Sequence, residues 1–456
     1  RIAGATAGAN WTPASGLTTI EELGSPVRTR RIVLSFDSAM GMWVLDGKHF
    51  DPNRIDARPR LGTTEVWELF NDNTGGKTSM THPFHMHLVQ FRVLERGRDG
   101  VFVSPPANER GWKDTVRIEP GETVRFAARF GEFTGNYMYH CHIFEHEDHS
   151  MMAQMRVVDL ARFSGIGRVE TAAAASAATF SPGVSAVFVS TSDNFPDALA
   201  AGPVAAGKGP VLLTSGGSLP SATRAEIERL RPAKAFVLGG PSVVPAAVEE
   251  ELRSLVPVVE RLAGNDRYET AAAVAAAFFT RPVPIAYVAS GRGFADALAG
   301  GAAAASLGGP MLLTEANALP PATGAALRNL APGRIVLLGG PLAVGEAVEN
   351  ALREIAPTTR ISGGDRYATA AAVVRDAFQG PVPALAVATG EAFPDALAGV
   401  PVASSLGGPL VLVPKSAPLP AAVRALIESL RPGAIRVLGG EGAVPAEVEE
   451  ALAELL

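Results

Sequence analysis

A period of about one hundred residues runs through the second part of the chain and limits what this part can fold into. An arginine, a threonine and an aspartate recur every 99 residues, and a glycine pair recurs every 100. The recurring residues are Arg168, Arg267 and Arg366; Thr171, Thr270 and Thr369; Asp197, Asp296 and Asp395; and the pairs that begin at Gly239, Gly339 and Gly439. Three copies in step indicate a stacked or symmetric array. We predict three tandem units, at 164–262, 263–361 and 362–456.

Within one copy, short apolar runs alternate with helical patterns. The predicted strands of the second copy are Ile285–Ser290, Pro310–Thr314 and Arg334–Gly340. Its predicted helices are Ala297–Ser306, Leu319–Leu330 and Gly345–Ile355. Strands that alternate with helices of this length are typical of parallel βαβ units with helices on both faces of the sheet. Each copy is therefore predicted to be a small α/β unit with a parallel sheet.

The first part of the chain has a different composition. All eight histidines, the one cysteine and all four tryptophans precede residue 150. The predicted strands are Arg31–Asp37, Thr64–Asn71, Asp114–Glu119, Glu122–Arg129, Asn136–His142 and Ala153–Val158. The third and fourth of these flank Pro120 and Gly121 and are predicted to form an antiparallel hairpin. Many short strands separated by turns predict an antiparallel β-sandwich over 30–160, after a connector at 1–29.

Charge and composition exclude several classes of partner. The formal net charge is −6 and no polybasic run occurs, so nucleic acid and anionic membrane surfaces are poor partners. No apolar stretch has the length of a transmembrane segment. The single cysteine, Cys141, excludes an intrachain disulfide.

Two windows of the first part, His82–His87 and His140–His146, hold six of the eight histidines. Successive side chains of a strand point to opposite faces. His140 and His142 are therefore predicted to project from one face and Cys141 from the other. One strand would thus contribute to two metal sites on its opposite sides.

The predicted site on the Cys141 side is completed by His82 and His146, with Met151 ten residues after the cysteine. Two imidazoles, a thiolate and a weakly bound thioether are the ligands of blue-copper electron-transfer sites. The opposite side gathers an imidazole-rich face suited to copper and open to a small ligand such as dioxygen, formed by His85, His87, His140 and His142. The alternatives are a structural zinc site or solvated histidines without a metal.

Two further histidines, His49 and His149, fit neither alternation. They are interpreted as surface residues or as residues that contact the metal ligands without binding the metal.

The stretches His82–Val93, Gly111–Val116 and Tyr139–Met152 resemble the C-terminal cupredoxin domain of multicopper oxidases, the superfamily of laccases and bilirubin oxidases. The resemblance implies copper as the cofactor, with dioxygen and a small reducing substrate as partners. It implies a type 1 copper on His82, Cys141, His146 and Met151, a type 2 copper on His85, and a type 3 pair on His87, His140 and His142. It also implies that Glu147 relays protons to dioxygen; the alternative for Glu147 is an exposed carboxylate.

The oxygen-reducing cluster of that family uses eight histidines, four of them from two His-x-His pairs in an N-terminal cupredoxin domain. This chain offers only the four from its own two pairs. Because the chain also begins with Arg1, we expect cupredoxin domains to precede it in the native protein.

The repeats resemble the type 2 cell-wall-binding repeat through Gly264–Ala271, Gly363–Ala370 and the closing glycine pairs. The resemblance implies a three-lobed, pseudo-threefold α/β assembly that holds secreted bacterial proteins on anionic wall polymers. An extracellular location at the cell wall follows. The first copy departs, because Gly167 and Val169 replace the aspartate and tyrosine of the other two.

Three sets of repeat residues have simpler explanations than ligand binding. The recurring arginines either bind polymer or, as we favour, form ion pairs with a neighbouring aspartate. The recurring aspartates precede predicted helices and are interpreted as N-caps. The glycine pairs are not part of a dinucleotide-binding pattern.

The sequence therefore predicts the C-terminal part of a secreted, wall-anchored multicopper oxidase. The alternatives are a wall-binding protein whose cupredoxin domain only holds or shuttles copper, and a structural protein in which the copper module has no role.

Overall fold

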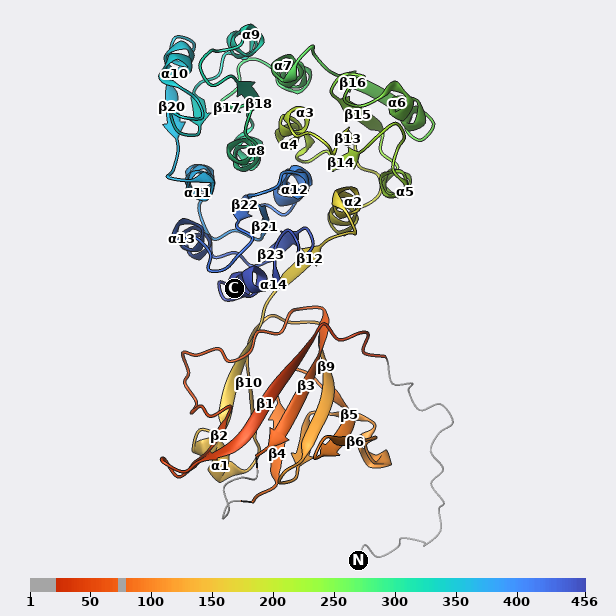
Figure 1. The fold of residues 1–456 in the computed structure, drawn as a ribbon, viewed down its shortest axis with the longest axis vertical. Coiled ribbons are helices and arrows are strands. Elements are labelled where there is room, and N and C mark those ends of the chain that lie inside the picture. Colours follow the sequence, from red (N-terminus) through yellow and green to blue (C-terminus); the bar gives the residue numbers. More distant parts are fainter. Residues whose placement is uncertain (1–21, 73–78) are drawn as a thin grey trace, which may run out of the picture. The chain divides into compact units, whose positions relative to one another are not determined.

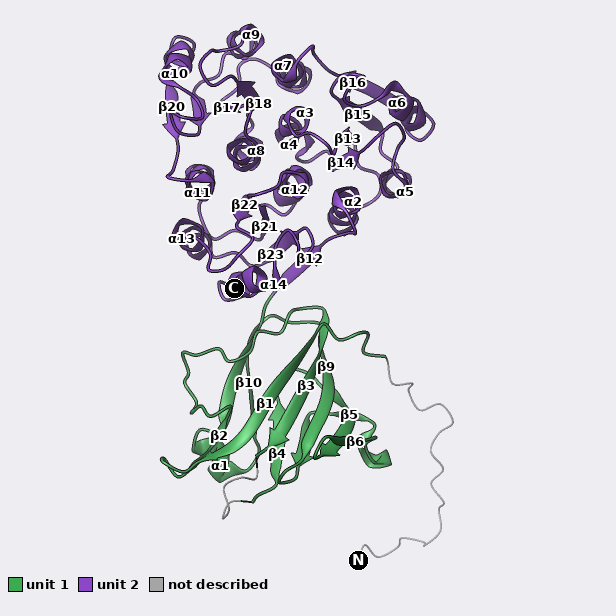
Figure 2. Ribbon diagram, viewed as in Figure 1, with its two compact units in different colours: residues 1–158 green, residues 159–456 purple. Residues whose placement is uncertain are grey.

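The computed structural model describes residues 22–72 and 79–456, and the chain forms two compact units, Arg1–Val158 and Asp159–Leu456 (Figure 2). Most of the predicted connector at 1–29 lies outside the described residues. Within the described ranges, no helix combines the length and apolar character that crossing a bilayer requires.

The first unit is a sandwich of two β-sheets (Figure 1). The larger sheet contains β1 (Arg28–Asp37), β2 (Met42–Leu45), β3 (Thr63–Asn71), β5 (Phe91–Arg98), β6 (Val101–Val103), β7 (Trp112–Lys113) and β9 (Thr123–Phe130), in the order β2-β1-β3-β9-β5-β6, with β7 also paired to β5. The smaller sheet has the order β11-β10-β4-β8 and contains β4 (His82–Met86), β8 (Thr115–Ile118), β10 (Gly135–Cys141) and β11 (Met152–Val157). The pairs are antiparallel except for β1 with β3. Trp67, Phe84 and Phe126 are fully buried in the core.

The predicted hairpin around Pro120 and Gly121 is wrong. β8 pairs with β4 in the smaller sheet, whereas β9 pairs with β3 and β5 in the larger one. The chain therefore crosses from one sheet to the other at this turn, where Gly121 has a φ of +71°. Both strands direct alternate apolar side chains into the same core, so their alternation alone cannot distinguish a hairpin from such an arch.

The second unit contains three four-stranded sheets, each with parallel pairing throughout. The first has the order β14-β13-β15-β16, with β13 (Ala186–Thr191), β14 (Val211–Thr214), β15 (Lys234–Leu238) and β16 (Val258–Leu262). The second has the order β18-β17-β19-β20, with β17 (Ala286–Ser290), β18 (Met311–Thr314), β19 (Ile335–Leu338) and β20 (Thr358–Ile361). The third has the order β12-β23-β21-β22, with β12 (Leu160–Phe163), β21 (Leu385–Thr389), β22 (Leu410–Val413) and β23 (Ile435–Leu438).

Helices cover these sheets in three lobes (Figure 1). They are α2 (Arg168–Thr179), α3 (Pro196–Leu199), α4 (Ala201–Ala205), α5 (Ser221–Leu230) and α6 (Ala246–Arg253); α7 (Arg267–Phe278), α8 (Ala295–Leu307), α9 (Pro321–Leu330) and α10 (Glu346–Arg353); and α11 (Arg366–Ala377), α12 (Pro394–Ser405), α13 (Ala421–Leu430) and α14 (Ala446–Ala453). α4, α8 and α12 contact one another at the centre of the unit. Many of their residues are alanine or glycine, and such small side chains allow helices to approach closely. The predicted pseudo-threefold α/β arrangement is confirmed.

The three lobes are joined into a closed ring by β12. The first and second sheets take their fourth strands, β16 and β20, from the segments that lead into the next lobe. The third sheet instead takes β12, which precedes the first lobe. Arg162 on β12 donates to the carbonyls of Gly439 and Val444 at 2.7 and 2.8 Å and pairs with Glu449. Arg261 and Arg360 make the same kinds of contact in the other sheets, at the same 99-residue interval. The unit thus closes on itself through its first strand.

Candidate functional site

Two groups of metal-ligating side chains meet on neighbouring strands of the first unit. β4 and β10 are antiparallel, with His85 opposite His140 and Phe84 opposite Cys141. The observed register agrees with the predicted alternation, because His82 and Cys141 lie on the core side, while His85 and His140 share the other face. α1 (Phe144–Asp148) follows β10 and returns His146 toward the cysteine.

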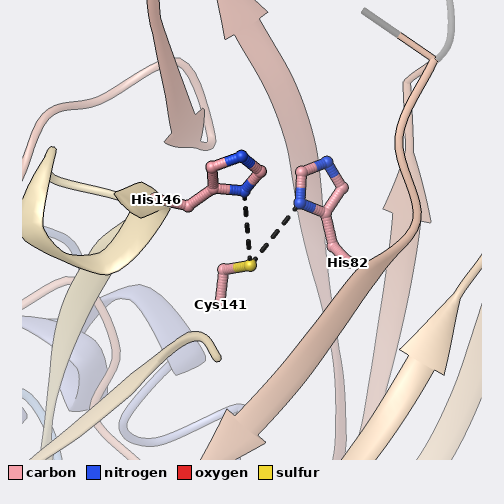
Figure 3. Close-up of side chains that lie close together, drawn as sticks. All are labelled: His82, Cys141 and His146. Atoms are coloured by element: carbon pink, nitrogen blue, oxygen red, sulfur yellow. Dashed lines mark hydrogen bonds between the residues drawn. The ribbon is translucent and has the colours of Figure 1, made fainter. Parts of the chain in front are cut away.

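The buried group consists of His82, Cys141 and His146 (Figure 3). The Sγ atom of Cys141 lies 3.5 Å from Nδ1 of His82 and 3.6 Å from Nδ1 of His146. A tetrahedral ion with a sulfur ligand at about 2.3 Å and a nitrogen ligand at about 2.0 Å would separate those two atoms by about 3.5 Å. Both nitrogens point at the sulfur in the figure, so the three side chains fit one soft metal ion as they stand.

Burial controls protonation in this group. Burial, with a smaller effect from His146, lowers the pKa of His82 to about 4, so its imidazole is neutral at pH 7 and able to ligate. Burial raises the pKa of the Cys141 thiol to about 11. Without a cation the thiol therefore keeps its proton, and binding of a metal releases it. The Nε2 atom of His82 has no hydrogen-bond partner among the described residues.

Trp43 and Met151 enclose the buried group. The Trp43 ring centroid lies 4.3 Å from that of His82 and 5.7 Å from that of His146. Met151 is fully buried, its carbonyl accepts from the backbone N–H of Cys141 at 3.1 Å, and its own N–H donates to the carbonyl of His146 at 2.9 Å. These bonds fix the Met151 backbone beside two of the three side chains. The sequence analysis did not predict Trp43 as part of the site, because its side chain is not a metal ligand and it lies far from the histidines in the sequence.

The second group lies on the other face of β4 and β10. Single ligand atoms of His85, His87 and His140 all lie within 4.8 Å of one another. Nε2 of His87 is 3.1 Å from Nε2 of His140, and the His142 ring centroid is 5.4 Å from that of His85. The structure therefore brings all four predicted imidazoles of this face together.

Backbone carbonyls orient two of these imidazoles. Nδ1–H of His85 donates to the carbonyl of Asp114 at 2.9 Å, and Nδ1–H of His140 donates to the carbonyl of Cys141 at 3.0 Å. Such bonds fix the tautomer and leave Nε2 as the ligating atom. Glu147 lies beside this group, with Oε2 3.5 Å from Nδ1 of His140. The sequence analysis did not predict that Asp114 orients a ligand, although Asp114 lies within the family-like stretch Gly111–Val116.

The two remaining histidines belong to neither group. His49 pairs with Asp37 at 3.1 Å, and this hydrogen bond is the main cause that lowers the pKa of Asp37. His149 is the C-terminal cap of α1.

In the repeats, the N-cap interpretation of the recurring aspartates is wrong. The N-caps of α3, α8 and α12 are Phe195, Phe294 and Phe393, without side-chain capping bonds. The aspartates lie inside the first turn, where their carboxylates face the glycine pairs. A Cβ on Gly439, for example, would lie 2.5 Å from Oδ2 of Asp395. Asp266 and Asp365 are the side chains that do cap helices, α7 and α11.

The recurring arginines join neighbouring lobes. Arg267 and Arg366 donate through Nη1 to the carbonyls of Gly291 and Gly390, in their own lobes, at 2.5 and 2.6 Å. Each also faces the aspartate of the preceding lobe: Arg267 attracts Asp197, Arg366 attracts Asp296, and Arg168 attracts Asp395 around the closure. Burial nonetheless raises the pKa of all three aspartates. Among the described residues these arginines form no ion pair with the aspartates within 4 Å, and their hydrogen bonds go to backbone carbonyls. The favoured ion-pair interpretation is therefore not confirmed as a direct contact.

Comparison with known proteins assigns each unit to a family. Residues 25–160 match the multicopper oxidase family, and residues 162–249, 261–349 and 360–449 match cell wall binding domain 2. A laccase of Bacillus subtilis (strain 168) is 44% identical over 119 residues, which are 23% of this chain and 22% of that protein. An amidase enhancer of the same organism is 30% identical over 294 residues, 64% of this chain and 40% of that protein.

A solved structure, Cwp8 from Clostridium difficile, superposes with a TM-score of 0.60 at 26% identity, covering 70% of this chain and 58% of that one. The chain thus spans less than a quarter of the laccase and under two thirds of the other two relatives. The cell wall binding repeats occupy more than half of the chain. The chain therefore belongs to the cell wall binding domain 2 family, of which it carries three copies, and these copies follow a multicopper oxidase domain.

Proposed function

We propose that His82, Cys141 and His146 hold a type 1 copper, with Met151 as the axial ligand. The observation that carries this assignment is the convergence of two Nδ1 atoms on one buried sulfur at 3.5 and 3.6 Å. A thiolate with two imidazoles favours copper or zinc, and a thioether at the fourth position favours copper. Met151 is buried and tied to Cys141 through the backbone, which supports its inclusion.

Copper at this position would accept one electron at a time from a phenolic or other small reductant, or from a metal ion. The neighbours of Cys141 in the chain are His140 and His142, so the backbone links the buried sulfur to the second group through few covalent bonds. The hydrogen bond from His140 Nδ1–H to the Cys141 carbonyl adds a second connection. We assign the passage of electrons to these links.

The second group is proposed to contribute half of an oxygen-reducing site, with His85 at a type 2 copper and His87, His140 and His142 at a type 3 pair. These imidazoles lie on one face, and backbone hydrogen bonds orient the Nε2 atoms of His85 and His140, which supports this assignment. Reduction of dioxygen to water also consumes protons, and we assign their delivery to the Glu147 carboxylate, whose Oε2 atom lies 3.5 Å from Nδ1 of His140. The remaining imidazoles would come from another cupredoxin domain.

The repeats are proposed to hold this oxidase on an anionic polymer of the cell wall, outside the cell. The family match of all three copies supports attachment to the wall, and the closed ring of lobes supports a self-contained binding module. The oxidase would then act on reductants that reach the cell surface.

Oxygen consumption tests the proposal. The chain by itself should bind copper but show negligible turnover with a phenolic reductant, because it offers four imidazoles to a site that needs eight. Addition of a cupredoxin domain with two His-x-His pairs should restore oxygen consumption, and Cys141→Ser should abolish it again. Four-electron oxygen reduction by the unaided chain would contradict the half-site. No gain with any added domain would favour the alternative, a wall-bound protein that only holds copper.

A further inference from the structure

The junctions between lobes are built from equivalent residues, but their cavities differ. A cavity of about 860 Å³ lies at the junction of the second and third lobes, where Phe195 of the first lobe also lines it, whereas its counterpart between the first and second lobes measures about 140 Å³. Both are lined by a recurring aspartate, the second glycine of a recurring pair and the arginine that follows on the next lobe. The sixfold difference therefore comes from the residues that do not recur.

Small residues open the larger cavity. Gly293 lines it where Asn194 lines the counterpart, 99 residues earlier. Ala343 likewise stands in the place of Val243. A Cβ on Gly293 would meet no atom within 4 Å, so this position borders open space.

An additional arginine lines the larger cavity. Arg292 lines it, at a position occupied by Asp193 in the first lobe and Glu391 in the third. The backbone N–H of Arg292 donates to Oγ of Ser290 at 3.2 Å, which holds this position at the end of β17. Arg366 reaches the same cavity from the third lobe. Two guanidinium groups from different lobes thus share one cavity.

The two carboxylates that line the cavity, Asp296 and Asp365, also have counterparts in the smaller one. Glu315, which lies near Tyr268 as Arg292 does, is not among the residues that line the cavity. Oδ1 of Asp365 accepts the N–H of Ala368 as an N-cap. Asp296 is drawn to Arg366. Arg292 is the charge that has no cationic counterpart at the same position in the other lobes.

Apolar side chains also line the cavity. The Phe294 ring lies beneath Arg366, whose guanidinium carbon is 5.9 Å from the ring centroid. Leu342 is completely exposed at the cavity, where the other lobes carry Ser242 and Gly442. A fully exposed leucine beside two guanidinium groups is suited to a ligand with both an apolar face and an acidic group, such as a sugar acid or a sugar phosphate.

We propose that this cavity, and not its counterpart between the first and second lobes, binds the acidic units of a wall glycan. Arg292 and Arg366 donate hydrogen bonds to a carboxylate or phosphate, and Phe294 and Leu342 contact the sugar ring. The inference rests on the proposed attachment of the repeats to an anionic polymer, and it names where one of its units binds.

Sedimentation of the full chain with purified bacterial cell walls tests the site. Arg292→Asp, which restores the charge found in the first lobe, should weaken binding about tenfold or more, because a charge-assisted bond is lost and a repulsion is added. Gly293→Asn, which copies the first lobe without a change of charge, should also weaken it. Arg328→Asp makes the same charge change on an exposed residue of α9 outside the cavity and should stay within about twofold of wild type.

The outcomes separate the two hypotheses. If the wild-type chain does not sediment with walls, the proposed attachment itself is contradicted. If the wild type sediments and Arg292→Asp binds as well as Arg328→Asp does, attachment stands but this cavity is not the site. Walls stripped of phosphate polymers and walls with amidated carboxylates distinguish the two acidic groups. Undiminished binding to walls that received both treatments would overturn recognition of an acidic unit.

Discussion

Single positions decide which chemistry each surface can perform. On β10, one residue of offset places Cys141 on the buried side and His140 on the face of the second group. In the third lobe, the carboxylate of Asp395 lies so close to Gly439 that only a glycine fits there. The glycine pair and the aspartate of this lobe, 44 residues apart in the sequence, are thus one structural feature, which explains why every copy carries both.

Gly439→Ala is expected to lower the free energy of unfolding of the second unit by about 1–3 kcal/mol, because Gly439 has a φ of +104° and a Cβ would meet Asp395. Gly440→Ala is the matched control, since a Cβ there would meet no atom within 4 Å. Urea denaturation of both variants provides the measurement. Equal losses at the two positions would show that the contact with Asp395 is unimportant.

Asp395 is also expected to make stability depend on pH. Burial raises the pKa of Asp395 above its usual 3.8, against the attraction of Arg168 and Lys415. The folded state then retains a proton that the unfolded chain releases, so the contribution is fully present below pH 3.8 and is lost as pH rises through the raised pKa. Relative to Asp395→Asn, which cannot ionise, wild type should lose stability in urea titrations as the pH rises from 3.8 through the raised pKa of Asp395. A constant difference would contradict the sign of the pKa shift.

At the scale of elements, periodicity predicts what is buried but not what pairs with what. The strands Ala286–Ser290, Met311–Thr314 and Ile335–Leu338 are continuous apolar runs covered on both faces, and they were predicted closely. The fourth strand of each sheet was missed, because Val258–Leu262 and its equivalents are partly exposed edges that include charged residues. Whether two strands pair across a turn, as on the two sides of Pro120, depends on contacts between residues that are far apart in the sequence.

The closing strand β12 supplies an element-scale prediction. A fragment that begins at Ser164, the boundary suggested by the sequence, lacks β12 and leaves the buried Glu449 without Arg162. The fragment also loses the pairing of β12 with β23 and the hydrogen bonds of Arg162 to Gly439 and Val444, so 164–456 should unfold at a much lower temperature than 159–456. Calorimetry of both fragments measures this difference. Matching melting temperatures would show that β12 is not needed to close the ring.

For the site, the alternation of histidines and cysteine predicted which strand residues lie on each face, whereas His146 lies on α1, outside this alternation. Trp43 and the Asp114 carbonyl were not predictable in this way, because neither carries a metal-ligating side chain suggested by spacing and both reach the histidines only through the tertiary fold. The packing around a metal site and the backbone hydrogen bonds to its ligands depend on the tertiary fold. The face of a strand on which each ligand lies follows directly from the sequence.

At the scale of the whole molecule, the chain joins two units with separate cores and separate chemistry. Only Asp159 stands between the last residue of the first unit, Val158, and the first residue of β12, Leu160. If attachment belongs to the repeats, 159–456 should sediment with purified walls while 22–158 stays in solution. Equal sedimentation of both fragments would contradict this division of labour.

Copper titration followed by visible absorption tests the type 1 assignment most directly. The purified chain should develop an intense thiolate-to-copper charge-transfer band that saturates at one tightly held ion per Cys141, because the buried sulfur and two imidazole nitrogens already stand at ligand distances. Cys141→Ser should lack the band while the repeats remain folded. A well-folded, copper-loaded wild-type chain that stays colourless would contradict the assignment.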